Sequence, residues 1–258
     1  RVEKTRNVIA QTKTGSTADV VMVGAHLDSV AEGGPGINDN ASGVAAVLET
    51  ALQLGGSSPQ VNNAVRFGFW GGAEEFGLLG SSDYVESLDV DALKDIALYL
   101  NFDMLGSPNP PGYFTYDGDQ SRRLDEREGV PPRVPEGSAG IERTLVAYLD
   151  GEGKPAEDTS FDGRSDYDSF TKSGVPSGGL FSGAEEKKSV QQAEVWGGGK
   201  ADEPSTRTIT SPPTPSTRST ARRCRSTAAE WPTWWACTRR TSVAATGYRS
   251  AMTGPATN

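Results

Sequence analysis

The only histidine in this chain ends an apolar run and is followed by carboxylates. Val20–Val23 leads into Gly24-Ala25-His26-Leu27-Asp28, and a loop rich in glycine and proline then brings in Asp39. A strand that ends in a histidine and a loop that returns an aspartate can place two ligands for a divalent metal at one edge of a sheet. His26 and Asp39 are therefore candidate metal ligands.

Two later apolar runs also end in acidic residues. Glu74-Glu75 follows the first of them, and Asp103 follows the second. Each residue alone has an ordinary structural explanation, such as a glutamate pair favoured by the N-terminus of a helix. One imidazole with several carboxylates suits Zn²⁺, and also admits Mn²⁺ or Co²⁺. Together these residues predict a hydrolytic centre in which bound metal activates water, one glutamate is a ligand and its neighbour is a base.

Hydrophobic periodicity predicts strands alternating with helices. The expected strands cover 20–27, 64–70, 97–105 and 176–183, the expected helices cover 41–54, 76–88 and 141–149, and 106–133 is expected to be rich in loops. This alternation indicates an α/β layer architecture. Sites in such sheets form at the ends of strands, where these acidic residues lie.

Composition bounds the class of protein. The chain has 258 residues, 35% of them hydrophobic, which suffices for one domain with a proper core. No apolar run is long enough to span a membrane. The net charge of -9 argues against nucleic acid as a partner. This charge is uneven, since the residues from Ser205 onward carry +7 and the first 204 carry -16.

Four longer motifs surround these candidate residues. They are Gly24-Ala25-His26-Leu27-Asp28-Ser29-Val30, Gly36-Ile37-Asn38-Asp39-Asn40-Ala41-Ser42-Gly43, Ala73-Glu74-Glu75-Phe76-Gly77-Leu78-Leu79-Gly80-Ser81 and Leu100-Asn101-Phe102-Asp103-Met104. These motifs resemble those of the two-zinc aminopeptidases, in particular the secreted bacterial leucine-aminopeptidase and aminopeptidase Y group. Their order and spacing match from Asn7 to about Trp196.

The resemblance implies a role for each matching residue. His26, Asp39 and Asp103 would bind one zinc ion, Asp39 would bridge to a second, and Glu75 would bind that second ion. Glu74 would be the general base, and Asp28 would orient His26 through its other ring nitrogen. The remaining matches concern substrate: Arg164 would help to hold its free amino end, while Met104 and Phe181 would line an apolar specificity pocket, although both are also ordinary core residues.

The resemblance also implies the setting of the site. Residues 1–204 would form a two-zinc peptidase catalytic domain that lacks residues before Arg1, with a central mixed, mostly parallel sheet flanked by helices. The parent protein would be secreted and monomeric, and would act on the N-termini of peptides or proteins without nucleic acid. Whether calcium also binds is left open.

The chain departs from this family in its last part. The family places a second histidine late in the chain on the zinc bound by Glu75, and here there is none. Residues 205–258 contain no Leu, Phe or Asp and are rich in Thr, Arg and Ser. A Thr/Pro linker over Ser205–Thr220 is one interpretation, but Cys224, Cys237 and three tryptophans fit a linker poorly.

A shifted reading frame explains the tail better. Permitted codons for Thr208–Arg223, read two bases later, can encode D-H-Q-P-A-D-T-V-D-K-I-D-R-T-A-L, which contains a histidine where the family expects one. Arg225–Thr241 treated in the same way can encode the family's closing amphipathic helix. We therefore expect 205–258 to be an irregular, frame-shifted tail without that helix, and one zinc ion to be lost.

Three functions are compatible with these residues. The first is a zinc aminopeptidase that prefers bulky apolar N-terminal residues. The second is a carboxypeptidase or a glutaminyl cyclase on the same scaffold, which Arg164 and Glu74 disfavour because they suit a substrate with a free amine. The third is a degenerate relative that binds one metal or only peptide, favoured by the absent histidine.

Overall fold

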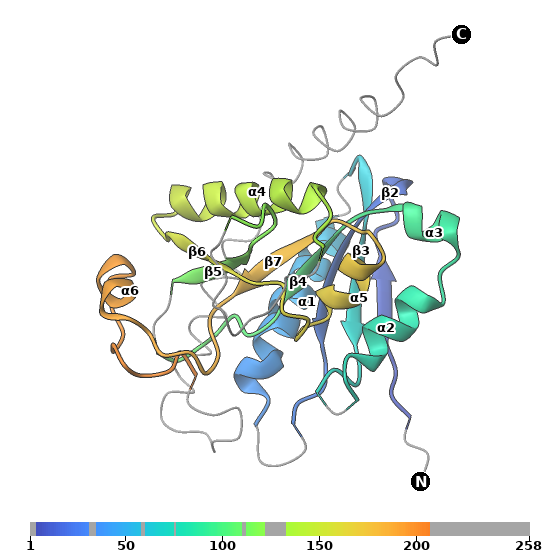
Figure 1. Ribbon diagram of the computed structural model, residues 1–258. Coiled ribbons are helices and arrows are strands. Elements are labelled where there is room, and N and C mark those ends of the chain that lie inside the picture. The colour runs from blue at the N-terminus through green and yellow to red at the C-terminus, as the bar shows by residue number, and fades with distance from the viewer. Residues whose placement is uncertain are drawn as a thin grey trace.

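The computed structural model describes residues 4–30, 35–57, 60–74, 76–109, 112–121 and 133–206. Within these ranges seven strands form one sheet in the order β1-β3-β2-β4-β7-β5-β6 (Figure 1). In chain order the strands are β1 Val8–Gln11, β2 Ser16–His26, β3 Asn63–Trp70, β4 Ile96–Phe102, β5 Tyr113–Tyr116, β6 Ala156–Thr159 and β7 Ser177–Phe181.

Helices connect the strands. They are the π-helical turn η1 Ile37–Ser42, then α1 Gly43–Ser57, α2 Leu79–Glu86, α3 Val90–Lys94, α4 Gly137–Gly151, α5 Tyr167–Lys172 and α6 Val190–Val195. Four of the six strand pairings are parallel, and only β1 with β3 and β5 with β7 are antiparallel. The predicted α/β fold with a mixed, mostly parallel sheet is therefore confirmed.

Alternation along the strands divides the core into two layers. On one face α1 and α4 cover a mainly aliphatic layer that includes Val23, Val65 and Leu100. On the other face α2 and α5 cover an aromatic layer that includes Trp70, Tyr99 and Phe170. Figure 1 shows these helices on opposite sides of the sheet. Because β2, β3 and β4 are parallel, the connections after them meet at one edge of the sheet.

Several predicted boundaries were wrong for local reasons. The helix expected over 76–88 begins only at Leu79, because Gly77 and Leu78 both have φ of 63°, a left-handed conformation that no α-helix continues through. The strand expected over 97–105 ends at Phe102, since Met104 has φ of 51°. The short strands β1, β5 and β6 and the short helices α3, α5 and α6 were not predicted.

In the part of the chain that the structure describes, the helices are all too short or too polar to cross a membrane.

Gly24 in β2 is required by the packing beneath the site. An added Cβ would lie 2.4 Å from the hydroxyl of Tyr99 and 2.6 Å from Nε1 of Trp70. We expect Gly24→Ala to lower the free energy of unfolding by about 1–3 kcal/mol, as overpacking does in other cores. Gly140→Ala in α4 is the control, because its Cβ meets no atom within 4 Å. That variant should gain roughly 0.5–1 kcal/mol, and urea denaturation of both would measure the contrast. Equal stability of the two variants would contradict the packing described here.

Candidate metal centre

Four side chains converge at the ends of β2, β3 and β4: His26 is the last residue of β2, and the other three lie in the connections that follow these strands. Nε2 of His26 lies 3.1 Å from Oδ1 of Asp39, 3.2 Å from Oδ1 of Asp103 and 3.8 Å from Oε1 of Glu74. His26 is 2% exposed, whereas the side chain of Glu74 is 27% exposed. The structure thus brings together four of the predicted site residues, with Glu74 on the solvent side.

This donor set fits a divalent cation. A single ring nitrogen can share at most one proton, so it cannot satisfy three carboxylates. Oδ1 of Asp39 is buried and has no hydrogen bond of acceptable geometry, although it lies so close to His26. Ligand atoms of His26, Asp39 and Glu74 all lie within 4.8 Å of one another. One imidazole and several carboxylates suit zinc, so a metal ion would balance the charge that these residues bring together.

The crowded carboxylates shift the pKa values of the group. Burial, followed by repulsion from Asp39, raises the pKa of Glu74 to about 7. Burial also raises the pKa of Asp39. Burial alone would lower the pKa of His26, but Asp103 and Asp39 raise it well above its ordinary value. For Asp103 the opposing effect of burial is overcome, and His26, Ser165 and Arg164 lower its pKa.

Asp28 holds the turn that carries Glu74. Its Oδ1 accepts hydrogen bonds from the backbone N–H groups of Gly72 and Ala73, both at 2.9 Å, and its Oδ2 accepts from that of Glu74 at 3.0 Å. Nδ1 of His26 lies 3.0 Å from the main-chain oxygen of Asp28 and 3.9 Å from its Oδ1. Asp28 therefore contacts His26 mainly through its backbone, while its carboxylate holds the Gly72–Glu74 turn.

Asparagine side chains fix the loop that carries Asp39. Asn40 donates from Nδ2 to the main-chain oxygen of Phe102, and its Oδ1 accepts from the N–H groups of Gly43 and Met104. Since the bonds to Phe102 and Met104 join groups on both sides of Asp103, they tie the Asp39 loop to the segment that carries Asp103. The sequence interpretation had not assigned a role to Asn40, although its place beside Asp39 was a usable signal.

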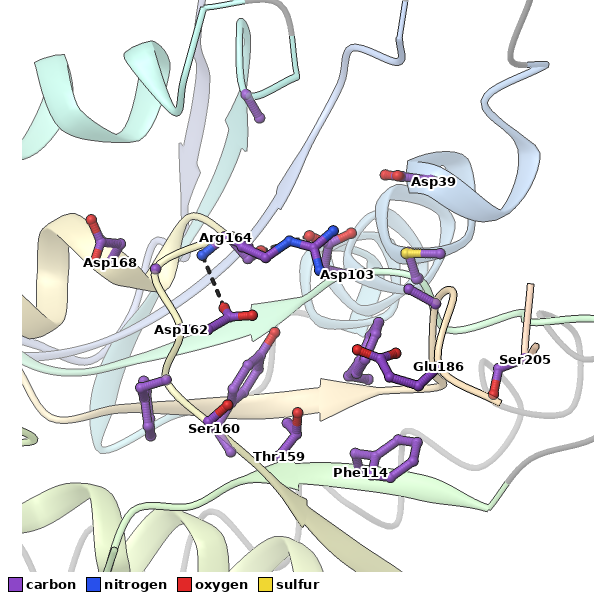
Figure 2. A pocket seen from close by; sticks show the side chains of 18 of the residues that line it. Asp39, Asp103, Phe114, Thr159, Ser160, Asp162, Arg164, Asp168, Glu186 and Ser205 are labelled. Atoms are coloured by element: carbon purple, nitrogen blue, oxygen red, sulfur yellow. Dashed lines mark hydrogen bonds between the residues drawn. The ribbon is translucent and has the colours of Figure 1, made fainter. Parts of the chain in front are cut away.

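A cavity of about 990 Å³ opens from the metal centre. The three residues expected from the sequence to contact substrate, Met104, Phe181 and Arg164, line this cavity. Phe114 adds an aromatic wall, with its ring centroid 5.9 Å from that of Phe181. Figure 2 shows Arg164 extending towards Asp103 and Glu186 on the facing wall. The guanidinium of Arg164 is held by Glu185, with Nη2 2.9 Å from Oε1.

Two predicted features lie outside the described residues. Glu75, the expected ligand of the second zinc, is one, and the tail beyond Thr206 is the other. Two further residues near the site were missed from the sequence. Ser165 donates to Oδ2 of Asp103 at 2.6 Å, and burial raises the pKa of Asp166 to about 7. Both directly follow Arg164 in the sequence, and this position beside a predicted site residue was a usable signal.

Comparisons with known proteins show which family the sequence matches. Residues 7–210 match the model described as Peptidase family M28. Over 201 residues, which are 78% of this chain and 39% of the relative, the chain is 78% identical to "Probable lipoprotein aminopeptidase LpqL" of Mycobacterium tuberculosis. The chain spans less than two fifths of the length of this relative and of two other curated aminopeptidases that it matches.

Two solved structures share the fold. "Aminopeptidase from Aneurinibacillus sp. strain AM-1" is 30% identical with a TM-score of 0.54, over 68% of this chain and 39% of that one. A zinc aminopeptidase from Bacillus subtilis is 24% identical with a TM-score of 0.59, over 88% of this chain and 49% of that one. The expectation of a freely secreted protein is contradicted, because the 78% identical relative is named a lipoprotein.

The shifted pKa values predict how metal-free stability depends on pH. Groups whose pKa is raised on folding stabilise the folded chain at low pH, and this contribution is lost as pH rises through the folded value. For Glu74 the loss runs from its ordinary value of 4.5 to about 7, and His26 acts in the same direction. With chelator present, we expect a lower melting temperature at about pH 8 than at about pH 5.5.

Excess Zn²⁺ should weaken or reverse this trend, since metal ligands must be deprotonated to bind. The chain has one histidine, so no other imidazole titrates in this range. Glu74→Gln is the matched variant and should flatten the metal-free pH dependence. Metal-free stability that rises with pH would contradict the geometry.

Proposed function

Because the chain belongs to peptidase family M28, we propose that it is the catalytic part of a metal-dependent aminopeptidase, which hydrolyses the N-terminal peptide bond of peptides and proteins. The observation that carries this proposal is the convergence of His26, Asp39, Asp103 and Glu74 at one end of parallel strands, inside a cavity large enough for a peptide end. The aminopeptidase names of the similar proteins support it.

The proposed cofactor is a pair of zinc ions. His26, Asp103 and Asp39 would hold one ion, and Asp39 with Glu75 would hold the other. Bound zinc supplies Lewis acidity and lowers the pKa of bound water towards neutrality. The donor chemistry supports zinc, since one imidazole with carboxylates is a set that zinc accepts. Asp39 suits a shared position because its Oδ1 is buried and lacks a hydrogen bond within the described residues.

Glu74 is the proposed general base. It takes a proton from the attacking water and passes it to the leaving amine, which requires a pKa near the working pH. Burial and Asp39 raise the pKa of Glu74 to about 7, which suits both transfers. The three backbone hydrogen bonds accepted by Asp28 support this role, because they hold the Glu74 turn against the metal centre.

Met104 and Phe181 are the proposed walls of the pocket for the N-terminal side chain. Met104 is 5% exposed and faces the cavity together with Phe181 and Phe114, so a bulky apolar side chain would replace water there. Arg164 would act at the substrate's amino end. Its guanidinium is paired with Glu185 and would act there as part of an ion pair.

We propose that the tail of the natural protein is read in the shifted frame. Thr206, the last described residue, accepts at Oγ1 a hydrogen bond of 2.9 Å from Asn38, the neighbour of Asp39. A histidine three residues later would lie within about 10 Å of this anchor by chain length. The match to the family model ends at residue 210, close to the change in composition at Ser205.

Two alternatives remain outcomes of the tests below. A carboxypeptidase or a glutaminyl cyclase would use the same donor set on another substrate. A one-metal relative is favoured by the printed sequence, which has a single histidine.

We propose that the natural protein is a membrane-anchored lipoprotein, which the name of its 78% identical relative supports. We also propose that it acts as a monomer.

Restoring the frame should restore the second metal. We call the chain with the printed 258-residue sequence the literal chain. We expect it to bind about one Zn²⁺ tightly and to turn over leucine anilide poorly. Its second zinc site has only the carboxylates of Asp39 and Glu75, which hold zinc less well than a set with an imidazole. A chain whose tail is replaced by the shifted reading should bind about two and be active. Metal analysis after dialysis and anilide hydrolysis would measure both. Full turnover or two tightly bound zinc ions in the literal chain would overturn this expectation. Activity on glutaminyl or C-terminal substrates alone would favour the alternatives.

Glu74→Gln in the frame-restored chain should separate chemistry from metal binding. Loss of a general base is expected to lower kcat by about 10²–10⁴-fold while the zinc content is retained. Glu86→Gln at the exposed end of α2 is the control and should leave both unchanged. A kcat within a few fold of the unsubstituted enzyme would remove Glu74 from the mechanism.

A further inference from the structure

A continuous series of hydrogen bonds runs from the aromatic layer to Asp103. Nε1 of Trp70 donates to the hydroxyl of Tyr99 at 2.9 Å, and that hydroxyl donates to Oδ1 of Asn101 at 3.0 Å. Nδ2 of Asn101 donates to Oγ of Ser165 at 2.7 Å, which donates to Oδ2 of Asp103 at 2.6 Å. Four consecutive bonds thus join the centre of the core to a candidate metal ligand.

The direction of this series is fixed at its start. An indole N–H can only donate, so the hydroxyl of Tyr99 accepts from Trp70 and keeps its own hydrogen for the next acceptor. That acceptor is the oxygen of Asn101, which determines the orientation of the amide and turns its NH₂ group towards Ser165. Ser165 then accepts from Asn101, and its single hydrogen is left for Asp103.

The end of the series determines how Asp103 presents its two oxygens. Oδ2 is occupied by the hydroxyl of Ser165, whereas Oδ1 lies 3.2 Å from Nε2 of His26, on the side of the metal centre. A carboxylate held at one oxygen cannot rotate freely to offer both. Asp103 therefore offers Oδ1 to the centre from a fixed orientation.

The fold makes this series rigid. Tyr99, Asn101 and Asp103 alternate along β4 and its end, so they share one face. Trp70, Tyr99 and Asn101 are each at most 1% exposed. The ring of Tyr99 stacks on Phe170 with centroids 4.0 Å apart and an interplanar angle of 7°.

The aromatic groups at the start of the series come from strands on either side of β2. Trp70 ends β3 and Tyr99 lies in β4, and both strands pair with β2. Gly24 of β2 leaves the space in which the two side chains meet, since a Cβ there would lie within 2.6 Å of both polar atoms. Tyr116 adds its hydroxyl beside Asn101 and Ser165.

We propose that Tyr99 and Asn101 are positioning residues for the metal centre, which act through Ser165 to hold Asp103 with Oδ1 towards the cation. The proposal rests on the proposed function in one respect, that Asp103 is a metal ligand. It extends the site from the residues that would touch the cation to Tyr99 and Asn101 in the buried core, neither of which the sequence motifs had given a role.

The test is metal binding by the literal chain, since its His26, Asp39 and Asp103 are intact. Zn²⁺ affinity would be measured by competition with a chelator, and the geometry at the centre by the visible absorption of bound Co²⁺. The variants are Asn101→Leu, Tyr99→Phe, Ser165→Ala and the double variant of Asn101→Leu with Ser165→Ala. Tyr84→Phe is the matched control, because Tyr84 packs on Trp70 in the same layer but bonds Arg66 instead.

We expect Asn101→Leu and Ser165→Ala each to weaken Zn²⁺ binding by about 10–100-fold and to shift the Co²⁺ spectrum. Tyr99→Phe should weaken binding by about twofold to tenfold, the equivalent of one hydrogen bond, and Tyr84→Phe should change neither. The double variant should bind no worse than Ser165→Ala alone, because Asn101 acts only through that hydroxyl.

Additive losses in the double variant, or equal effects of Tyr99→Phe and Tyr84→Phe, would overturn the proposal. If Asn101→Leu does not fold, as judged by near-ultraviolet circular dichroism of the metal-free chain, Tyr99→Phe with Ser165→Ala supplies the same cycle. Absence of Zn²⁺ binding by the unsubstituted chain would overturn the metal centre and this proposal together. Binding is measured without substrate, so absence of peptidase activity would count against the proposed function alone.

Discussion

The structure is organised around one imidazole nitrogen that faces three carboxylates. Oxygens of Asp39 and Asp103 lie within 3.2 Å of Nε2 of His26, and Glu74 completes the group at 3.8 Å. Such a concentration of negative charge is unfavourable in a buried site unless protons or a cation neutralise it. The fold must therefore hold these groups together against their repulsion, and much of the surrounding hydrogen bonding does so.

Each ligand is held by a different device. The carboxylate of Asp28 accepts hydrogen bonds from three backbone N–H groups of the Gly72–Glu74 turn and so supports the proposed base. The backbone oxygen of the same residue contacts His26. Asn40 links the Asp39 loop to Phe102 and Met104, the residues on both sides of Asp103. Asp103 is held through Ser165. In each case a polar side chain satisfies backbone or carboxylate groups that a cation does not reach, which leaves the remaining oxygens facing the centre.

The sequence predicted the parts of this arrangement that depend on local pattern. Apolar runs identified β2, β3, β4 and β7, and the acidic residues after them marked the edge at which the site forms. Predictions were wrong or absent where backbone conformation or distant contacts decide the outcome. The left-handed φ angles of Leu78 and Met104 shorten α2 and β4, and no periodicity reveals them. Short strands such as β5 depend on pairing with β7, which is distant in sequence.

The same distinction separates ligands from the residues that hold them. His26 and Asp39 can be recognised because they occur together with further acidic residues after successive apolar runs, although each alone has an ordinary structural explanation. Asn101 lies in an apolar strand and its partner Ser165 is 64 residues away, so only the folded chain shows that they meet. Yet Gly24, Tyr99 and Asn101 depend on one another. Without the glycine, the indole N–H of Trp70 and the hydroxyl of Tyr99 cannot meet. Without the hydrogen bond between them, the side-chain amide of Asn101 has no fixed orientation. Substitution at any one of these positions should therefore change the orientation of the Asp103 carboxylate, although neither Gly24 nor Tyr99 forms a hydrogen bond with it.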